Sequence, residues 1–468
     1  MGDIVIKPHR FETKRGETAD AGWGTFAVPE NRRAPHFRPI TLAFVRFPST
    51  SRRPGHPIVF LAGGPGESGI DVARGQHFRL FMSLREAADV VVLDQRGTGA
   101  SRPAIRCDER WSVPLDRPTD RAEMLALALE KSRACADRLR VAGADLDGYN
   151  TVESADDVDA LRVALGAEKV QLVGASYGTH LGFAVLRRHG DRVGRCVFGG
   201  AEGPDHTFKL PSIVERHLRR FGELVGRDPV WGKRLPDFLG TIGDTLVRLE
   251  RNPVSIEVPD PKSGQSVVVG IGRFDVEYIT AAGLADTRLL PLLPQWYAGM
   301  SRGDFTLFAT APILTRYLFH LKRGLGGNAM GLLTDCASGV TRERWQRIER
   351  EAAETTLGRT IDFPFPEICP AWGCPDLGDD FRSPLTASNP VLFFSGSFDC
   401  RTPLENVTEV RSWLSDSRCV EVEGAGHFDT FLAAPGGARL MTSFFSGHDV
   451  DSPRLQVTPI IQLEPPRS

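Results

Sequence analysis

Short runs of apolar residues alternate along this chain with longer segments in which apolar side chains recur every three or four positions. Runs at 57–62, 89–94, 170–173 and 390–394 are typical of strands buried on both faces. Between them, residues 120–141 and 151–166 have the apolar spacing of amphipathic helices. Residues 20–50 favour two antiparallel strands at the start of the sheet. The alternation predicts an α/β fold with a doubly wound, mostly parallel sheet.

This rhythm changes near residue 205. From there to residue 385 the pattern is mostly helical, with a short strand-like piece from Val254 to Val269, and the strand–helix alternation then resumes. We therefore predict a sheet domain whose first part spans 1–204 and whose second part spans 386–449. A mostly helical cap at 205–385 is inserted between these parts. Residues 450–468 contain four prolines and are expected to form an irregular tail.

Composition narrows the classes of function that need to be considered. The 468 residues are 41% hydrophobic and 25% charged, with a net charge of −2, which is ordinary for a globular protein. No basic excess suggests a nucleic acid or an anionic membrane as partner. No apolar run approaches the roughly 18 residues of a membrane span. The charged N-terminus lacks an apolar signal core, so we expect a cytoplasmic protein, although a chain that has lost a leader would look the same.

Eight cysteines are too few for a disulfide scaffold in a chain of this length. We favour reduced structural thiols, while Cys107 with Cys135, and Cys336 with Cys369 or Cys374, could form bridges in an oxidising compartment. Cys369 and Cys374 have no matching second pair, so no zinc site is expected. No metal or other cofactor is predicted.

The residues 174–178 read Gly-Ala-Ser-Tyr-Gly and stand between a buried strand and a helix-like segment. A nucleophile elbow requires this order of strand, sharp turn and helix. The turn would expose the Ser176 hydroxyl at the top of the sheet, at the N-terminus of a helix whose dipole favours negative charge. Ser176 is therefore the predicted nucleophile.

The two strands after the cap each end in a candidate partner for Ser176. One is followed by Asp399 and the other by His427, and the order Ser, Asp, His matches the order that this sheet topology imposes. His427 would take the serine proton, and Asp399 would orient the imidazole. The glycine cluster at 63–69 would supply the Gly64 N–H to an oxyanion hole, with the Tyr177 N–H as second donor.

Asp94 and Arg96 follow the strand at 89–94, where polar side chains can fix the loop that leaves a sheet. An ion pair that holds this loop is the favoured interpretation of the two residues. We do not expect either residue to take part in the chemistry.

Five motifs taken together resemble the proline iminopeptidase and tripeptidyl aminopeptidase group of α/β-hydrolases. They are Gly-Gly-Pro-Gly at 63–66, Asp-Gln-Arg-Gly-Thr-Gly-Ala-Ser at 94–101, Gly-Ala-Ser-Tyr-Gly at 174–178, Gly-Ser-Phe-Asp at 396–399 and Gly-Ala-Gly-His at 424–427. The resemblance implies a serine exopeptidase that acts at free N-termini, with cap carboxylates for the substrate amine. Ala62 and Tyr177 replace the His and Trp usual in proline iminopeptidases, so the tripeptidyl branch, commonly secreted, fits better.

No motif fixes the carboxylate that would bind a substrate amine. Glu202 and Asp205 follow a strand end on the active-site side and are the first candidates, and Glu67 beside the oxyanion loop is the next. Fold and triad do not choose the acyl substrate, so a carboxylesterase or an amide or lactone hydrolase is the alternative to an aminopeptidase. The complete triad argues against a non-catalytic binding protein. The expected partner is a peptide or a small acyl substrate, with no nucleic acid or membrane.

Overall fold

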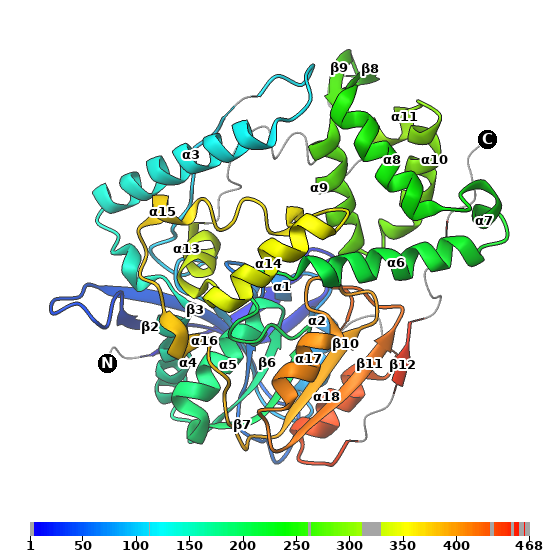
Figure 1. Ribbon diagram of the computed structural model, residues 1–468. Helices are drawn as coiled ribbons and strands as arrows, with labels where there is room; N and C mark the ends of the chain where they lie inside the picture. Colours follow the sequence, from blue (N-terminus) through cyan, green and yellow to red (C-terminus); the bar gives the residue numbers. More distant parts are fainter. Residues whose placement is uncertain are drawn as a thin grey trace.

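The computed structural model describes residues 4–111, 113–260, 264–310, 329–430, 435–450, 454–457 and 463. Within these residues, one ten-stranded sheet has the order β1-β2-β3-β5-β4-β6-β7-β10-β11-β12 (Figure 1). Its strands are β1 Val5–Glu12, β2 Thr18–Pro29, β3 Pro39–Phe47, β4 Ile58–Leu61, β5 Val90–Asp94, β6 Val170–Ala175, β7 Val193–Gly199, β10 Val391–Gly396, β11 Ser417–Glu423 and β12 Arg454–Gln456. The first three strands join one another and β5 in antiparallel pairs, and the remaining pairs are parallel.

Helices cover both faces of this sheet, which is why its central strands are mostly apolar on both faces. Val91 and Leu93 of β5 pack toward α4 (Thr151–Ala164), α5 (Tyr177–His189) and α17 (Leu404–Arg411). Val90 and Val92 pack on the opposite face toward α1 (Gly69–Ala73), α2 (Phe78–Leu84) and α18 (Gly437–Phe445). Alternate residues of a strand point to opposite faces, so both sets are buried. The predicted α/β class with a mostly parallel, doubly wound sheet is confirmed.

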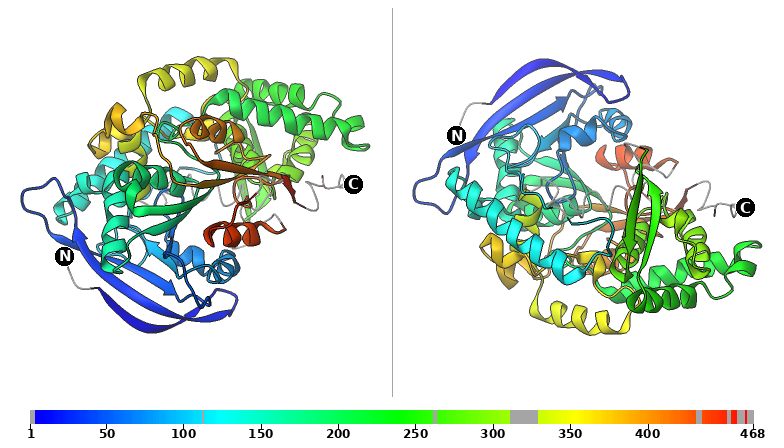
Figure 2. Two further views of the ribbon diagram at one scale, coloured as in Figure 1. Left: turned by 90° about the horizontal axis from the view of Figure 1, so that it is seen from below. Right: turned by 90° about the horizontal axis from the view of Figure 1, so that it is seen from above.

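A second group of elements lies above the sheet in Figure 1 and has a hydrophobic core of its own. Its elements are α6 Pro211–Arg227, α7 Trp231–Arg234, α8 Phe238–Arg251, the hairpin β8 Val254–Pro259 and β9 Ser266–Ile271, α9 Arg273–Leu284, α10 Leu293–Ser301 and α11 Thr306–Ala309. Phe398 and Cys400, which flank Asp399 in the loop after β10, are part of this core. The helical segment therefore packs directly on the loop that carries the predicted catalytic acid. Figure 2 shows β1–β3 on the side of the molecule away from α6–α8.

Further helices follow this group along the chain. They are α13 Ala329–Ser338, α14 Arg342–Glu354, α15 Cys369–Trp372 and α16 Gly378–Arg382. The long helix α3, Arg121–Val141, packs against α15 (Figure 1). Among the described residues, no helix combines the length and the hydrophobicity needed to cross a bilayer.

Three details of the predicted pattern differ from the structure. Strand β1 was not predicted, because it lies at the sheet edge and is mostly exposed, so it lacks an apolar signature. The prediction of a wholly irregular tail at 450–468 is wrong at Arg454–Gln456, because these residues form strand β12 and pair with β11. The helices α9 and α13 were also not predicted. The apolar spacing of the cap segment also predicts a helix at 305–321, of which residues 311–321 lie outside the described residues. The exact limits of the cap at 205 and 385 stay a prediction.

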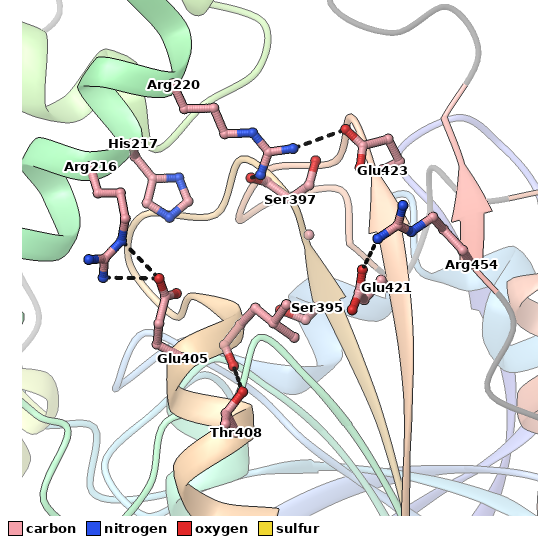
Figure 3. A pocket seen from close by; sticks show the side chains of 12 residues that line it. Arg216, His217, Arg220, Ser395, Ser397, Glu405, Thr408, Glu421, Glu423 and Arg454 are labelled. Carbon is pink, nitrogen blue, oxygen red and sulfur yellow. Dashed lines mark hydrogen bonds and ion pairs between the residues drawn. The ribbon is translucent and has the colours of Figure 1, made fainter.

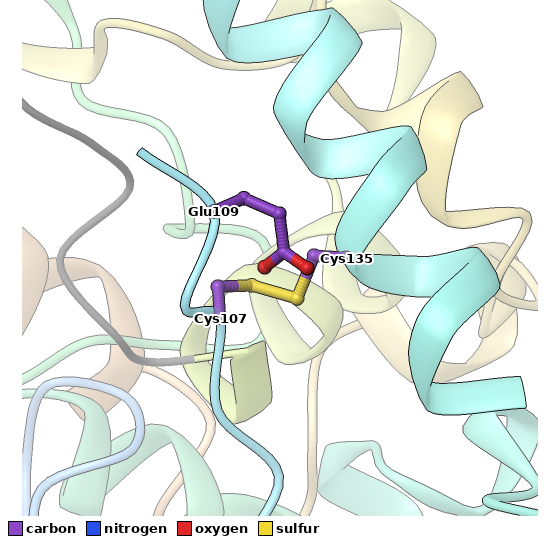
Figure 4. A group of neighbouring side chains, drawn as sticks. All are labelled: Cys107, Glu109 and Cys135. Carbon is purple, nitrogen blue, oxygen red and sulfur yellow. A yellow bond between two sulfur atoms is a disulfide. The ribbon is translucent and has the colours of Figure 1, made fainter. Parts of the chain in front are cut away.

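Two disulfides correct the interpretation that all cysteines are reduced. Cys107 bonds to Cys135, and Cys336 bonds to Cys369. Glu109 lies beside the first bridge, as Figure 4 shows, but the two sulfur atoms are bonded to each other and so do not offer thiolates to a metal. A reducing cytosol would leave these four residues as thiols, so the cytoplasmic location stays a prediction.

Candidate active site

Ser176 stands at a sharp turn between β6 and α5. Its φ of 53° and ψ of −125° make it the one residue other than glycine with a positive φ among those described. A Cβ on Gly178 would lie 2.0 Å from the Leu61 carbonyl oxygen, and one on Gly174 would lie 2.6 Å from the Gly178 oxygen. Close backbone packing therefore requires glycine at both flanking positions. Ser176 between them adopts the strained positive φ, which directs its hydroxyl out of the turn.

His427 and Asp399 meet at the ends of neighbouring strands. The ring atom Nδ1 of His427 lies 3.1 Å from each carboxylate oxygen of Asp399. The Asp399 side chain is fully buried and that of His427 is 8% exposed. Strands β10 and β11 are parallel neighbours, so the loops at their carboxyl ends lie side by side. This brings Asp399 and His427 together although the two residues are 28 positions apart in sequence.

Thr402 completes this contact and was not among the predicted site residues. Its hydroxyl donates to Asp399 Oδ2 at 2.6 Å and lies 3.0 Å from His427 Nδ1. Because the hydroxyl proton is committed to Asp399, the Thr402 oxygen can only accept from His427, which places the histidine proton on Nδ1. Nε2 then carries the free lone pair that a general base needs. A threonine three residues after an aspartate is a local turn signal that sequence reasoning could have used.

The charge on Asp399 is stabilised despite its burial. Burial by itself would raise the pKa of this carboxyl group. The positive charge of a protonated His427, together with hydrogen bonds from His427 and Thr402, outweighs burial and holds the pKa well below its ordinary value. The backbone N–H groups of Arg401 and Thr402 also donate to the carboxylate, at 2.9 and 2.8 Å. Asp399 is therefore ionised at neutral pH.

Ser176 and His427 line the same cavity of about 260 Å³, together with Gly63, Gly64 and Arg401. The structure records no hydrogen bond between the Ser176 hydroxyl and the His427 ring. In many hydrolases this hydrogen bond shortens to its catalytic length only when substrate is bound. The Tyr177 N–H opens helix α5 beside this cavity, where the first N–H groups of a helix have no intrahelical acceptor. The structure thus brings Ser176, His427, Asp399, Gly64 and Tyr177 into one region.

Two of the three carboxylates considered for a substrate amine have partners within the chain. Glu202 is buried and accepts from Lys209 Nζ at 2.7 Å. Asp205 accepts from the backbone N–H and the hydroxyl of Thr341 at 2.6 and 2.7 Å, at the start of α14. Either carboxylate would have to lose its present partner to receive an ammonium group. Glu67 lines the cavity with Ser176, and burial raises its pKa.

A carboxylate that the sequence did not reveal is Asp335 on α13. Burial and the negative charge of Glu202 raise its pKa well above the ordinary value, and the positive charges of Lys209 and Arg401 offset only part of this effect. Burial raises the pKa of the Tyr177 hydroxyl, and the negative charge of Asp335 adds to this effect. Asp335 therefore lies near both the residue after the nucleophile and Arg401 of the cavity. No sequence motif marks it, because α13 comes from a distant part of the chain.

Asp94 and Arg96 hold their loop as expected but do not pair with each other. Asp94 accepts from the Ser68 hydroxyl and the Ala100 N–H at 2.7 Å each. Arg96 is fully buried and donates twice to Asp157 at 2.7 Å. The predicted ion pair is therefore wrong in its partners. Each side chain fixes a different part of the turn because the two leave the strand in opposite directions.

Comparison with known proteins agrees with this arrangement. Residues 56–235 match the family model described as alpha/beta hydrolase fold, and residues 364–451 match the model described as TAP-like protein. The chain has the α/β-hydrolase fold. The resemblance to the proline iminopeptidase and tripeptidyl aminopeptidase group is confirmed by the second model and by the relatives that follow.

Three relatives differ in how much of each chain is aligned. Serine protease Hip1 of Mycobacterium tuberculosis is 35% identical over 191 residues, which are 39% of this chain and 36% of that protein. The tripeptidyl aminopeptidase of Streptomyces lividans is 26% identical over 437 residues, covering 88% of this chain and 79% of that protein. Carboxylesterase B of Mycobacterium tuberculosis is 31% identical over 205 residues, covering 42% and 38%. The names of the first two relatives support a peptidase-like serine hydrolase. The match to Hip1 spans little more than a third of Hip1's length.

Proposed function

We propose that this α/β-hydrolase is a serine aminopeptidase that releases short segments from the free N-termini of peptides. The observation that carries the proposal is the strained Ser176, which shares a cavity with a histidine whose Nδ1 contacts a buried aspartate. Strain of this kind at an exposed hydroxyl is kept where the surrounding structure serves chemistry.

In this mechanism, Ser176 Oγ attacks the substrate carbonyl while His427 Nε2 takes the hydroxyl proton. The C–N bond then breaks, and the same proton passes to the leaving amine, which departs as the shortened peptide. Water, deprotonated by His427, attacks the acyl-enzyme and releases the N-terminal segment as a carboxylic acid. Asp399 holds the imidazole orientation and stabilises the imidazolium, and the N–H groups of Tyr177 and Gly64 stabilise the oxyanion.

The carboxylates near the cavity support a substrate that carries an ammonium group. Asp335 has no side-chain hydrogen bond to another described residue, in contrast to Glu202, which is paired with Lys209. The raised pKa of Asp335 means that its negative charge is poorly compensated where it stands. An ammonium placed beside it would supply that compensation, so we assign Asp335 as the amine anchor and Glu67 as the second candidate.

Chromogenic tripeptidyl amides with free or acetylated N-termini, together with short acyl esters, test this function. We expect turnover of the free-amine amides and loss of it in Ser176→Ala with folding retained. Asp335→Asn should lower kcat/KM for free-amine substrates by about tenfold or more, since a desolvated charge pair is lost, and should leave blocked esters unchanged. Asp244→Asn on the exposed face of α8 is the matched control. Equal rates on free and blocked amides would contradict the aminopeptidase assignment.

A carboxylesterase is the second candidate, because one aligned relative is named Carboxylesterase B. The triad geometry serves an ester as well as an amide, and only the groups around the acyl chain discriminate. Ester turnover that is indifferent to a free amine, with no amide turnover, would select this candidate.

A further inference from the structure

A second cavity, of about 450 Å³, lies between α6, α17 and the carboxyl ends of β10 and β11 (Figure 3). It shares no lining residue with the cavity of Ser176. Arg454 of β12 closes one side, and Arg216, His217 and Arg220 project from α6 on the other. It is therefore separate from the proposed active site, with walls from both the helical segment and the sheet domain.

Three ion pairs surround this cavity and cancel its charge. The guanidinium and carboxylate groups lie 2.8–3.1 Å apart in the pairs Arg216–Glu405, Arg220–Glu423 and Arg454–Glu421. All six side chains are about a third exposed or more. Pairs exposed to this degree contribute little free energy, typically below about 1 kcal/mol, so their members can exchange partners with a ligand at small cost.

The inner wall holds polar groups that the chain leaves unpaired. His217 is 9% exposed and Ser395 is 1% exposed. His217 Nδ1 and Ser395 Oγ have no hydrogen-bond partner among the described residues. Burial lowers the pKa of His217, so it adds no positive charge to the cavity at neutral pH. Figure 3 shows its ring directed into the space between the ion pairs.

We propose that this cavity binds a small zwitterion, such as a free amino acid or a short peptide with unblocked ends. A ligand with a single charge would satisfy one member of an ion pair and leave the other without a counter-charge. An apolar ligand would remove water from six charged groups and return no hydrogen bond. A ligand with an ammonium and a carboxylate can bind one glutamate and one arginine at once, and a volume of about 450 Å³ can hold a molecule of two or three residues.

A ligand bound to Arg220 in this cavity would act on a residue that contacts the loop carrying Asp399. Arg220 donates to the Ser397 carbonyl oxygen at 2.8 Å, and its guanidinium lies 4.9 Å from the centre of the Phe398 ring. Asp399 is the next residue. If the chain is the aminopeptidase proposed above, its own products belong to this ligand class, but binding itself does not depend on that activity.

Titration calorimetry with triglycine on full-length Ser176→Ala protein tests the proposal without turnover. We expect binding that weakens by about tenfold or more in each of Arg220→Gln and Glu405→Gln, because each removes one charge-assisted contact. Arg347→Gln is the matched control, since Arg347 forms an exposed pair with Glu351 on α14, away from the cavity. N-acetyl-triglycine and triglycine amide, which each lack one charge, should bind more weakly by a similar factor.

Binding at the active site is distinguished by adding Asp335→Asn to the Ser176→Ala protein. Triglycine binding that persists in this variant and is lost in the two cavity variants supports the proposal. Affinity unchanged in both cavity variants overturns it, as does equal affinity for the singly charged peptides or no binding at millimolar triglycine. Because Arg220 and Glu405 belong to different ion pairs, failure of one variant to fold leaves the other as the test.

Discussion

Replacing Lys209 by methionine would leave the Glu202 carboxylate buried without its counter-charge. In the structure, Lys209 Nζ donates to Glu202 Oε2 at 2.7 Å and to the carbonyl oxygens of His206 and Thr207 at 3.1 and 3.0 Å. The two side chains of the pair are 9% and 6% exposed. The methionine keeps most of the side-chain volume, so the main loss is electrostatic.

The expected loss of unfolding free energy is ~3–5 kcal/mol at pH 7, the usual cost of breaking a buried ion pair from one side. Burial would raise the pKa of Glu202, and the charges of Lys209 and His180 reverse this and lower it. Above the unfolded-state pKa of about 4.3, the native pair therefore contributes stability, which is lost as pH falls through the lower folded-state pKa. In Lys209→Met the folded-state pKa of Glu202 rises instead, so the variant gains stability relative to wild type as Glu202 becomes protonated.

Urea denaturation at several pH values, followed by fluorescence and circular dichroism, measures this difference. Coincidence of the two probes justifies a two-state treatment. The deficit should be largest at pH 7 and should shrink as pH falls through the raised folded-state pKa of Glu202 in the variant, which lies above the ordinary value of about 4.3. Glu202→Leu added to Lys209→Met should restore most of the lost stability, since no buried charge remains. Arg347→Met, which breaks an exposed pair, should cost less than about 1 kcal/mol. A deficit no larger than this control, or one independent of pH, would refute the reasoning.

Three further predictions concern the elbow, the acid loop and the second bridge. Thr402→Val should lower kcat by about 10–100-fold at unchanged KM, because His427 loses a positioning contact. Thr402→Ser keeps the hydroxyl and should therefore have nearly the wild-type kcat. An unaltered kcat in the valine variant would contradict this role. Gly178→Ala places a Cβ 2.0 Å from a β4 carbonyl oxygen and should lower the unfolding free energy by about 1–3 kcal/mol or more. The control Gly226→Ala has open space around the new Cβ and should not destabilise the protein. Equal denaturation midpoints for the two variants would contradict the prediction. Cys336→Ser removes the bridge to Cys369, which closes 33 residues of chain, and should lower the unfolding free energy by about 2–4 kcal/mol. The measurement compares the variant with wild type without reductant, and equal denaturation midpoints would contradict the prediction.

Local sequence carried enough information for the fold class and for the nucleophile. The apolar runs of β4, β5, β6 and β10 mark strands buried on both faces, and this pattern depends only on the composition of a few consecutive residues. Ser176 was recognisable because the elbow imposes glycine at both flanking positions through backbone packing. The edge strand β1 and the short strand β12 were missed, since an exposed strand needs no apolar pattern.

Contacts between distant segments were beyond what the sequence alone could indicate. The motifs offered His427 and Asp399 as partners, but the Thr402 hydroxyl that contacts both became evident only from the folded loop. Even a near neighbour can be missed, because Glu202 is buried against Lys209, seven residues further on, through a loop whose path no motif indicates. A residue's charge state and partners depend on burial and on side chains brought together from remote positions.

The sequence by itself determined the strand–helix alternation, the chain order of Ser176, Asp399 and His427, and the resemblance to a group of hydrolases. These features arise from local periodicity and from glycine positions that only close packing requires. The tertiary structure decided which carboxylates are already paired, that Asp335 lies within electrostatic range of Arg401, and that three ion pairs line a second cavity beside Ser397. Each of these depends on side chains that folding brings together from different elements, and a one-dimensional pattern does not record that.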